Sequence, residues 1–364
     1  MGGIGFNKLP WVYSRAGGRR RTFFFQRRRR ERKLMTMTAD FSGKALAYTG
    51  TPTLVSFSPP ALRRGEALIR LLYAGICNTD LEILQGYMGF TGIMGHEFVG
   101  VVTECGDADW VGRRVTGEIN IPCGRCAMCR QGLGNHCPNR QVMGIQDRDG
   151  CFAPFFTLPL ANLHRIPDSV PDRRAVFSEP LAAAFQPFNQ HDFSRAAACL
   201  VLGDGKLGIL QALAASHMFA DCRLAGKHDA KLSLARELGI TAVRANELPH
   251  TRFDVVFEAT GRPEGLACAV SLLKPRGVLV LKTTSAQASR IHAAAIVVNE
   301  LTVLGSRCGP FDRAIAYMER ERPRLELLIS AAFPLSQGLK ALEKAKHPES
   351  VKVLLYPDSR RPTG

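Results

Sequence analysis

The sequence has no long hydrophobic run. No stretch of its 364 residues approaches the roughly 18 consecutive apolar residues that a membrane-spanning helix needs, which excludes an integral membrane protein. Internal repeats and low-complexity linkers are also missing. The hydrophobic fraction of 46% and the charged fraction of 22% are ordinary for a globular protein. At roughly 150 residues per domain, the length suggests about two domains.

Acidic residues are absent from the first 30 positions. In residues 1–33, nine Arg and two Lys face one Glu, so this arm carries +10 of the formal net charge of +16. The high pI therefore says little about the rest of the chain, which shows no basic stripe with interleaved aromatics and no sign of a nucleic-acid partner. Arg-rich, acid-free composition is typical of an organelle transit peptide. There are two alternatives. The true first residue could be Met35 or Met37, or the segment could be a basic interaction arm.

We treat residues 1–37 as a disordered, transit-like extension and leave it out of the fold. If it is a transit peptide, the protein belongs in a plastid or mitochondrion; otherwise we expect a cytoplasmic location.

Cysteine is present and clustered. Four of the eleven cysteines crowd into one short segment, at Cys123, Cys126, Cys129 and Cys137. Disulfide scaffolds are usually short secreted chains, so in a chain of this length the cluster indicates a metal site. The spacing C-x2-C-x2-C-x7-C supplies the four soft ligands of a closed, structural zinc site. The alternatives are four unrelated thiols, or a site in which His136 replaces Cys137.

Two kinds of architecture alternate along the body. From Lys44 to about Pro167, short strand candidates such as 67–72, 98–102 and 114–118 are separated by Gly- and Pro-rich turns. From about Ala197, buried strand-like runs alternate with helical periodicity, as in the pair 199–202 and 207–218. The second pattern is a βαβ series and predicts a parallel sheet. The fold class is therefore α/β, with a β-rich part before the βαβ series and a short, less regular tail after it.

Three further segments contain residues that bind metal in other proteins. They are Gly75–Asp80 with Cys77, Gly95–Gly100 with His96 and Glu97, and Ser178–Ala182 with Glu179. Alone, each is more often a core residue or a hydrogen-bonded pair. The four-cysteine cluster and the glycine motif at Gly203, Gly205 and Gly208 belong to the same series. In this order, the segments resemble the zinc-dependent medium-chain dehydrogenases, which include alcohol, polyol and threonine dehydrogenases. The resemblance covers about residues 44–356.

This resemblance implies a GroES-like β domain and a Rossmann domain with a doubly wound parallel sheet. We expect the GroES-like domain at 38–180 and 306–364, and the Rossmann domain at 181–305. The resemblance also implies a catalytic zinc ion in addition to the structural one, with Cys77, His96 and Glu179 as its ligands. Glu97 matches an auxiliary carboxylate that can approach the metal.

The resemblance assigns roles to one short segment after the first metal ligand. Thr79 matches the hydroxyl that receives the proton of the substrate alcohol, and Asp80 matches the acid that orients the histidine ligand. Many relatives carry a His at the end of this proton relay, where this chain has Glu82. A carboxylate can still exchange protons with solvent, so we expect a changed pH optimum.

The glycine motif Gly203, Gly205 and Gly208 fits G-x-G-x-x-G between a buried strand and a helix, which is the context of a dinucleotide-binding turn. NAD enzymes place an acid at the end of the next strand, where this chain has Gly226 followed by Lys227 and His228. Without a carboxylate to repel it, a 2′-phosphate fits, and we expect a preference for NADP(H) over NAD(H). Arg223 could help; alternatively, Asp229 could bind the ribose.

The sequence thus predicts a zinc-dependent oxidoreductase that transfers hydride between NADP(H) and a small alcohol or carbonyl compound, as a homodimer or homotetramer. The small, apolar stretches 87–90 and 308–311 suggest an uncharged or weakly polar substrate. One alternative is a zinc-free reductase of the same fold, which would lack the metal ligands. Another is a catalytically weak, zinc-stabilised dinucleotide-binding protein that acts as a sensor or structural protein.

Overall fold

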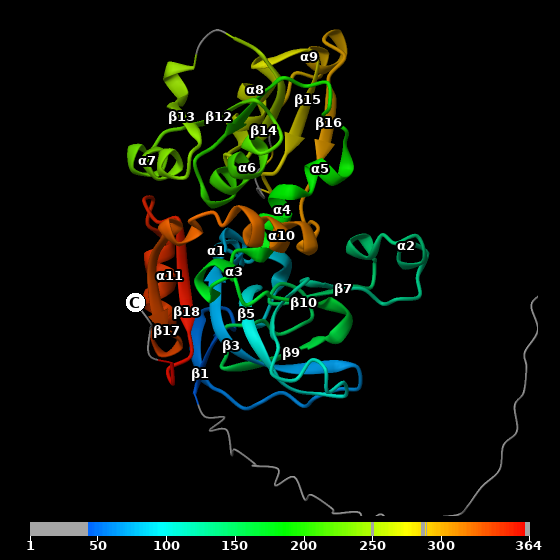
Figure 1. Cartoon of the computed structure of the whole chain (residues 1–364), viewed down its shortest axis with the longest axis vertical. Coiled ribbons are helices and arrows are strands. Elements are labelled where there is room, and N and C mark those ends of the chain that lie inside the picture. Colours follow the sequence, from blue (N-terminus) through cyan, green and yellow to red (C-terminus); the bar gives the residue numbers. More distant parts are fainter. Residues whose placement is uncertain (1–42, 249–250, 285–287, 289, 361–364) are drawn as a thin grey trace, which may run out of the picture. The chain divides into compact units, whose positions relative to one another are not determined.

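The structure is a computed structural model that describes residues 43–248, 251–284, 288 and 290–360. The basic arm at 1–37 lies outside the described residues. The two kinds of architecture expected from the sequence are both present (Figure 1). Within the described part of the chain, no helix is long and apolar enough to cross a membrane.

The β-rich part is built on a seven-stranded sheet. Its strands follow the order β10-β6-β5-β3-β18-β17, and β9 also pairs with β3. All pairings are antiparallel except that of β17 with β18. The bounds of these strands are β3 Glu66–Ile76, β5 Glu97–Cys105, β6 Arg114–Gly117, β9 Phe155–Pro159, β10 Leu163–Arg165, β17 Ile329–Pro334 and β18 Lys352–Tyr356. The chain's last strand thus returns beside one of its first.

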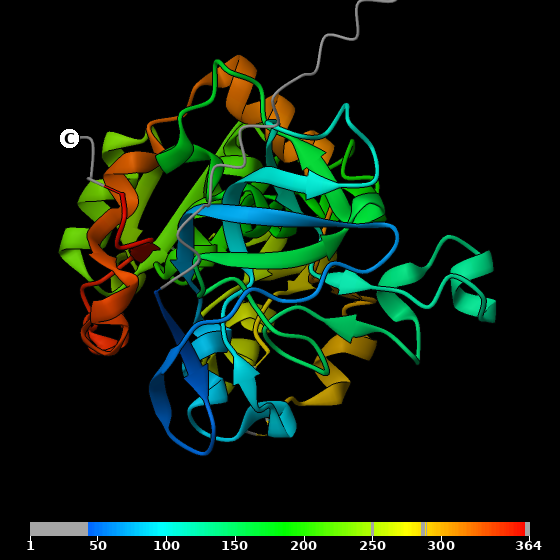
Figure 2. The same ribbon diagram turned by 90° about the horizontal axis from the view of Figure 1, so that it is seen from below.

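Two small sheets accompany the large one. The first has the order β2-β1-β4, with β1 Lys44–Tyr48, β2 Pro52–Ser56 and β4 Gly92–Ile93. The second pairs β7 Asn120–Ile121 with β8 Gln141–Val142. Between β7 and β8 lies the four-cysteine segment with its helix α2 (Ala127–Arg130), which projects away from the sheets in both views (Figures 1 and 2).

The second part is a six-stranded sheet in the order β13-β12-β11-β14-β15-β16. Every pairing in it is parallel, and in the order of the chain the strands run 3-2-1-4-5-6, the arrangement of a doubly wound dinucleotide-binding fold. The bounds are β11 Ala198–Leu202, β12 Asp221–Gly226, β13 Thr241–Arg244, β14 Phe253–Glu258, β15 Leu273–Leu281 and β16 Thr302–Gly305. The fold class predicted from the sequence is confirmed: a GroES-like antiparallel part and a Rossmann sheet.

Helices connect the strands of both parts. Those of the parallel sheet are α6 Lys206–Ser216, α7 Asp229–Glu237, α8 Pro263–Ser271 and α9 Ala293–Val298. The others are α1 Asn78–Ile83, α3 Asp172–Ala175, α4 Ser178–Phe185, α5 Pro187–Gln190, α10 Phe311–Glu321 and α11 Gly338–Lys346. Helices α4 and α10 pack against each other through residues such as Phe185 and Tyr317, in a core that contains strand residues of both sheets.

Candidate functional site

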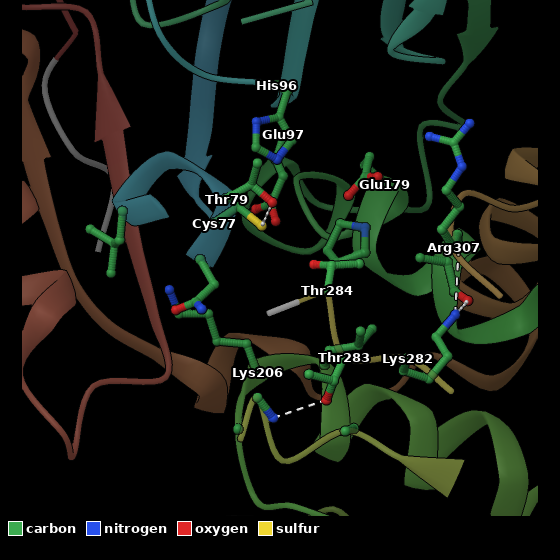
Figure 3. A pocket seen from close by; sticks show the side chains of 18 of the residues that line it. Cys77, Thr79, His96, Glu97, Glu179, Lys206, Lys282, Thr283, Thr284 and Arg307 are labelled. Carbon is green, nitrogen blue, oxygen red and sulfur yellow. Dashed lines mark hydrogen bonds between the residues drawn. The ribbon is translucent and has the colours of Figure 1, made fainter. Parts of the chain in front are cut away.

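Three of the predicted metal ligands form one compact group. Cys77, His96 and Glu97 offer ligand atoms that all lie within 4.8 Å of one another. Cys77 follows β3 and begins helix α1, whereas Glu97 opens the neighbouring strand β5. Because β3 and β5 pair antiparallel, with Gly75 opposite Glu97, the end of one strand meets the start of the other. The sheet register therefore brings together ligands that lie 19 positions and more apart in the sequence (Figure 3).

Asp80 contacts two members of this group, Cys77 and His96. Its carboxylate is fully buried and accepts a hydrogen bond of 2.8 Å from the backbone N–H of Cys77. Its second oxygen lies 3.3 Å from Nδ1 of His96. With Nδ1 turned toward Asp80, the Nε2 atom of His96 is the nitrogen left for a metal. Burial alone would lower the pKa of His96, but the carboxylate of Asp80 and the thiol of Cys77 together outweigh burial and raise that pKa.

Glu97 is held by a residue that the sequence analysis missed. Lys352, on the last strand β18, donates to Oε2 of Glu97, and both side chains are 1% exposed. The other oxygen, Oε1, is buried without a hydrogen-bond partner in the described structure. A Cβ at Gly75 would lie 2.2 Å from Oε2, so only glycine leaves room for this carboxylate. One free buried oxygen beside a thiol and an imidazole fits a zinc ligand set.

Glu179 does not complete the compact group. It lies in the first turn of α4, across the same cavity from Cys77, with its carboxylate toward the cavity (Figure 3). Loss of hydration raises the pKa of Glu179 to about 7; the charge of His96 opposes this rise and that of Glu97 adds to it. The family resemblance implied Glu179 as the third ligand and Glu97 as the auxiliary carboxylate. In the structure Glu97, not Glu179, lies in the compact group with Cys77 and His96, because it directly follows His96 and begins β5.

The four-cysteine cluster has the dimensions of a closed zinc site. Sulfur separations are 3.4 Å for Cys126–Cys129, 3.7 Å for Cys126–Cys137 and 4.0 Å for Cys123–Cys129. Four zinc–sulfur bonds of 2.3 Å in a tetrahedron place the sulfurs about 3.8 Å apart. All four cysteines predicted from the spacing belong to this group, and His136 does not. Backbone N–H groups of Arg125 and Cys126 lower the pKa of Cys123 to about 6, which favours the thiolate that zinc binds.

The glycine motif forms the turn between β11 and α6. No atom lies within 4 Å of a Cβ built on Gly205, so that side of the turn is open to an incoming pyrophosphate. A Cβ on Gly208 would lie 1.8 Å from the carbonyl oxygen of Gly203, so that contact requires glycine. The geometry fits the phosphate group of a dinucleotide at the N-terminus of α6.

The end of β12 differs from the expectation. Gly226 ends the strand and Lys227 and His228 follow it, as predicted, and both of these side chains are exposed. However, the carboxylate of Asp204, from the glycine motif, lies at this place and accepts hydrogen bonds from the backbone N–H groups of both Lys227 and His228. The assumption that no carboxylate lies here was therefore wrong, because a residue from the neighbouring turn supplies it.

The two other residues considered at this place, Asp229 and Arg223, each have an ion-pair partner. Asp229 forms an ion pair with Arg244 of β13. Arg223 lies 3.0 Å from Asp221, at the opposite end of β12. Arg244 lies opposite Gly226 in the pairing of β12 with β13, so the Asp229–Arg244 pair lies near the end of β12, whereas the Arg223–Asp221 pair does not.

One cavity of about 490 Å³ joins the metal group to the glycine motif. Its wall includes Cys77, His96 and Glu97 on one side, and Gly205 and Lys206 on the other. Lys206 donates a hydrogen bond of 3.2 Å to the carbonyl oxygen of Ile76. Ile76 directly precedes the first metal ligand, Cys77. The nucleotide turn and the metal group thus border the same space.

Two family models match this chain, each over a different segment. Residues 63–168 match the alcohol dehydrogenase GroES-like domain, and residues 176–356 match the glucose dehydrogenase C-terminus. D-altritol 5-dehydrogenase of Agrobacterium fabrum is 30% identical over 324 residues, which cover 84% of this chain and 96% of that protein. The chain belongs to the zinc-type medium-chain alcohol and polyol dehydrogenase family. It is thus an NAD(P)-dependent oxidoreductase acting on CH–OH groups.

Two solved dehydrogenases of this kind differ in their nucleotide. An alcohol dehydrogenase of Escherichia coli CFT073, complexed with NADH, is 26% identical, with a TM-score of 0.79 over 87% of this chain and 99% of that one. A zinc-binding dehydrogenase of Sinorhizobium meliloti 1021, bound to NADP, is 28% identical, with a TM-score of 0.80 over the same shares. Both nucleotides therefore occur among relatives of similar identity.

The cavity of this dehydrogenase is more polar than the sequence suggested. Tyr87, Met88 and Cys308 line it as expected, but so do Lys282 and Arg307 (Figure 3). Lys282 follows β15, is 5% exposed and donates to the carbonyl oxygen of Ala183 at 2.7 Å. Burial lowers its pKa to about 7. No motif in the sequence marked Lys282, because it stands alone after an apolar strand.

Proposed function

We propose that this chain oxidises a secondary hydroxyl of a small polyol, or reduces the matching ketone, with a nicotinamide dinucleotide. One observation carries the proposal: a single cavity is lined both by Cys77, His96 and Glu97 and by the glycine turn that would hold a dinucleotide. Lys282, Arg307 and Glu179 on the same wall offer hydrogen-bond donors and acceptors to a hydroxylated substrate. The relative that acts on D-altritol supports a polyol over an apolar alcohol.

The residues of the chain divide the work as follows. When bound, zinc supplies a Lewis acid for the substrate oxygen, and the nicotinamide takes up or returns the hydride. Thr79 lines the cavity, with Oγ1 3.8 Å from Sγ of Cys77, and would receive the proton of the substrate hydroxyl. Asp80 holds His96 in place. Glu82 lies one turn after Thr79 on α1 and outside the cavity wall, where it would exchange the proton with solvent.

For the nucleotide, the sequence predicted NADP(H) over NAD(H) on the strength of Lys227 and His228. Both residues are exposed at the end of β12, as that prediction needs. It also needed the place beside them to be free of negative charge, and Asp204 lies there. The relatives with NADH and with NADP leave the choice to the residues of this chain.

For assembly, we propose a homodimer or homotetramer, as the sequence predicted. Strand β16 is an edge of the parallel sheet, and Val303 on it is 43% exposed. In the helix before it, Val297 and Val298 are 75% and 79% exposed. An unpaired edge beside exposed apolar side chains supports pairing with a second copy.

A substrate panel tests the proposed function. Zinc-loaded protein would be assayed with four- to six-carbon polyols and NAD⁺ or NADP⁺, following the absorbance of reduced nicotinamide, with Cys77→Ser as the matched control. We expect oxidation of at least one polyol by the wild type and none by the variant. Dinucleotide binding with two zinc ions per chain, but no turnover of any alcohol or ketone, would instead support the sensor or structural alternative.

A further inference from the structure

Asp204 occupies an unusual place in the glycine motif. It is the residue between Gly203 and Gly205, and its side chain is 8% exposed. Instead of pointing to solvent, it crosses to the end of the neighbouring strand β12. There, Oδ2 accepts two backbone hydrogen bonds of 2.7 Å, from Lys227 and from His228. Nδ1 of His228 lies 3.0 Å from the other oxygen, Oδ1.

Asp204 and Gly226 fit together sterically. A Cβ built on Gly226 would lie 2.4 Å from both Cβ and Oδ2 of Asp204, and 2.5 Å from its Cγ. The side chain of Asp204 therefore fills the space into which any side chain at position 226 would extend. An acid at the end of this strand is what binds the adenosine ribose in NAD enzymes. Here the strand has no acid, and the turn places one at the same spot.

We infer that Asp204 serves as the ribose-binding carboxylate of this enzyme and makes it prefer NAD(H) to NADP(H). The inference rests on the proposed function only in requiring that the glycine turn binds a nicotinamide dinucleotide. It replaces the NADP(H) preference that the sequence predicted.

Hydrogen bonding at this place supports the inference. A 2′-phosphate at this place would need hydrogen-bond donors. The donors closest to it are the backbone N–H groups of Lys227 and His228 and the imidazole of His228, just before α7. All three already face Asp204. Burial works against the charge of Asp204, but the hydrogen bonds from His228 and Lys227 outweigh it and hold its pKa below the usual range. The carboxylate is thus ionised at neutral pH, where it accepts a ribose hydroxyl and repels a phosphate.

Three basic side chains near this place do not reverse the arrangement. Arg244, opposite Gly226 in the sheet, is paired with Asp229. Lys227 is exposed, so its attraction for a phosphate is weakened by solvent. Lys231, 8% exposed, lies close enough to Asp204 for the two charges to interact, and burial lowers its pKa. Its ammonium group therefore already interacts with a carboxylate before any nucleotide binds.

Binding of nucleotide fragments tests the inference without turnover. Calorimetry on the full-length, zinc-loaded protein would compare ADP-ribose with 2′-phospho-ADP-ribose. We expect the wild type to bind ADP-ribose at least about tenfold more tightly, the worth of one charge-assisted contact. Asp204→Asn should reduce this ratio by about tenfold. Asp221→Asn, which removes the same charge from the pair with Arg223 at the opposite end of β12, should change it by less than about twofold.

Two further variants separate charge from structure. Gly226→Asp should lower the melting temperature and weaken both ligands, because the new side chain meets Asp204. The exchange variant Asp204→Gly/Gly226→Asp returns the acid to the strand and should regain most of the preference for ADP-ribose. This variant also keeps the test decisive if Asp204→Asn fails to fold.

Equal or tighter binding of 2′-phospho-ADP-ribose by the wild type would overturn the inference, as would a ratio unchanged in Asp204→Asn. Preference for ADP-ribose together with no oxidation of any polyol would sustain the role of Asp204 while the proposed function fails. If a folded, zinc-loaded protein binds neither fragment, both proposals fall.

Discussion

The two metal-binding groups of this enzyme are built in opposite ways. The four-cysteine group comes from one segment of fifteen residues, Cys123–Cys137, in which three of the four cysteines are partly exposed. The Cys77 group joins two strands and has two of its three members buried. Its supports, Asp80 and Lys352, come from a helix and from the last strand of the chain.

The two groups therefore depend on different sources of stability. The four-cysteine segment has little apolar surface of its own to bury, so bound metal must hold its turns together. The Cys77 group is positioned by the sheet whether or not metal is present. Removing a ligand should therefore damage structure in the first group and chemistry in the second.

The largest expected effect is on catalysis. Cys77→Ser should reduce kcat by at least about a thousandfold, because Lewis-acid activation is worth several kcal/mol. The melting temperature should stay within about 2 °C of the wild type, since the sheet holds the site. Elemental analysis should find the zinc content lowered from two ions per chain to one. A variant that unfolds instead would show that the two groups do not differ as described.

The next largest effect is on stability, from the ion pair between Lys352 and Glu97. Lys352→Met leaves the Glu97 carboxylate buried without its cation, which should cost about 3–5 kcal/mol of unfolding free energy. The double variant Lys352→Met/Glu97→Gln should recover much of this loss, because it removes the unpaired charge. Denaturant titration of the metal-free proteins measures both. Equal destabilisation in the single and double variants would argue against a charge effect.

Loss of a ligand from the exposed group should act locally. Cys123→Ser should cost at least about 2 kcal/mol and lower the melting temperature by roughly 5 °C. Hydrogen exchange should accelerate most between residues 122 and 140, with the parallel sheet still protected. Cys105→Ser, a partly exposed cysteine outside both groups, is the matched control and should change neither quantity.

The smallest expected effect is a pH dependence from Lys282. Its pKa is about 7 in the folded protein against 10.5 for an ordinary lysine, because it is buried. Between these values the unfolded chain binds the extra proton, so stability should rise with pH across that window. In Lys282→Met this contribution disappears. The stability of the wild type relative to this variant should increase by about 1–2 kcal/mol from pH 7 to pH 9, measured by denaturant titration.

The sequence alone was sufficient for features whose parts lie close together along the chain or repeat with a clear period. The spacing of Cys123 to Cys137 predicted a closed metal group, and all four sulfurs lie at zinc-site distances. Buried strand-like runs alternating with helical periodicity predicted the parallel sheet, and the glycine motif lies at its first turn. These features depend on local turns and on the hydrophobic pattern, which the order of residues determines directly.

Tertiary structure alone decided which side chains meet across the fold. Lys352 reaches Glu97 because β18 pairs with β3, and no local signal connects residues 255 positions apart. Asp204 reaches the end of β12 because two parallel strands place their ends side by side, so the acid sought at position 226 came from another turn. Charges interact through space and not along the chain, so the partners of a carboxylate emerge only when the strands are paired.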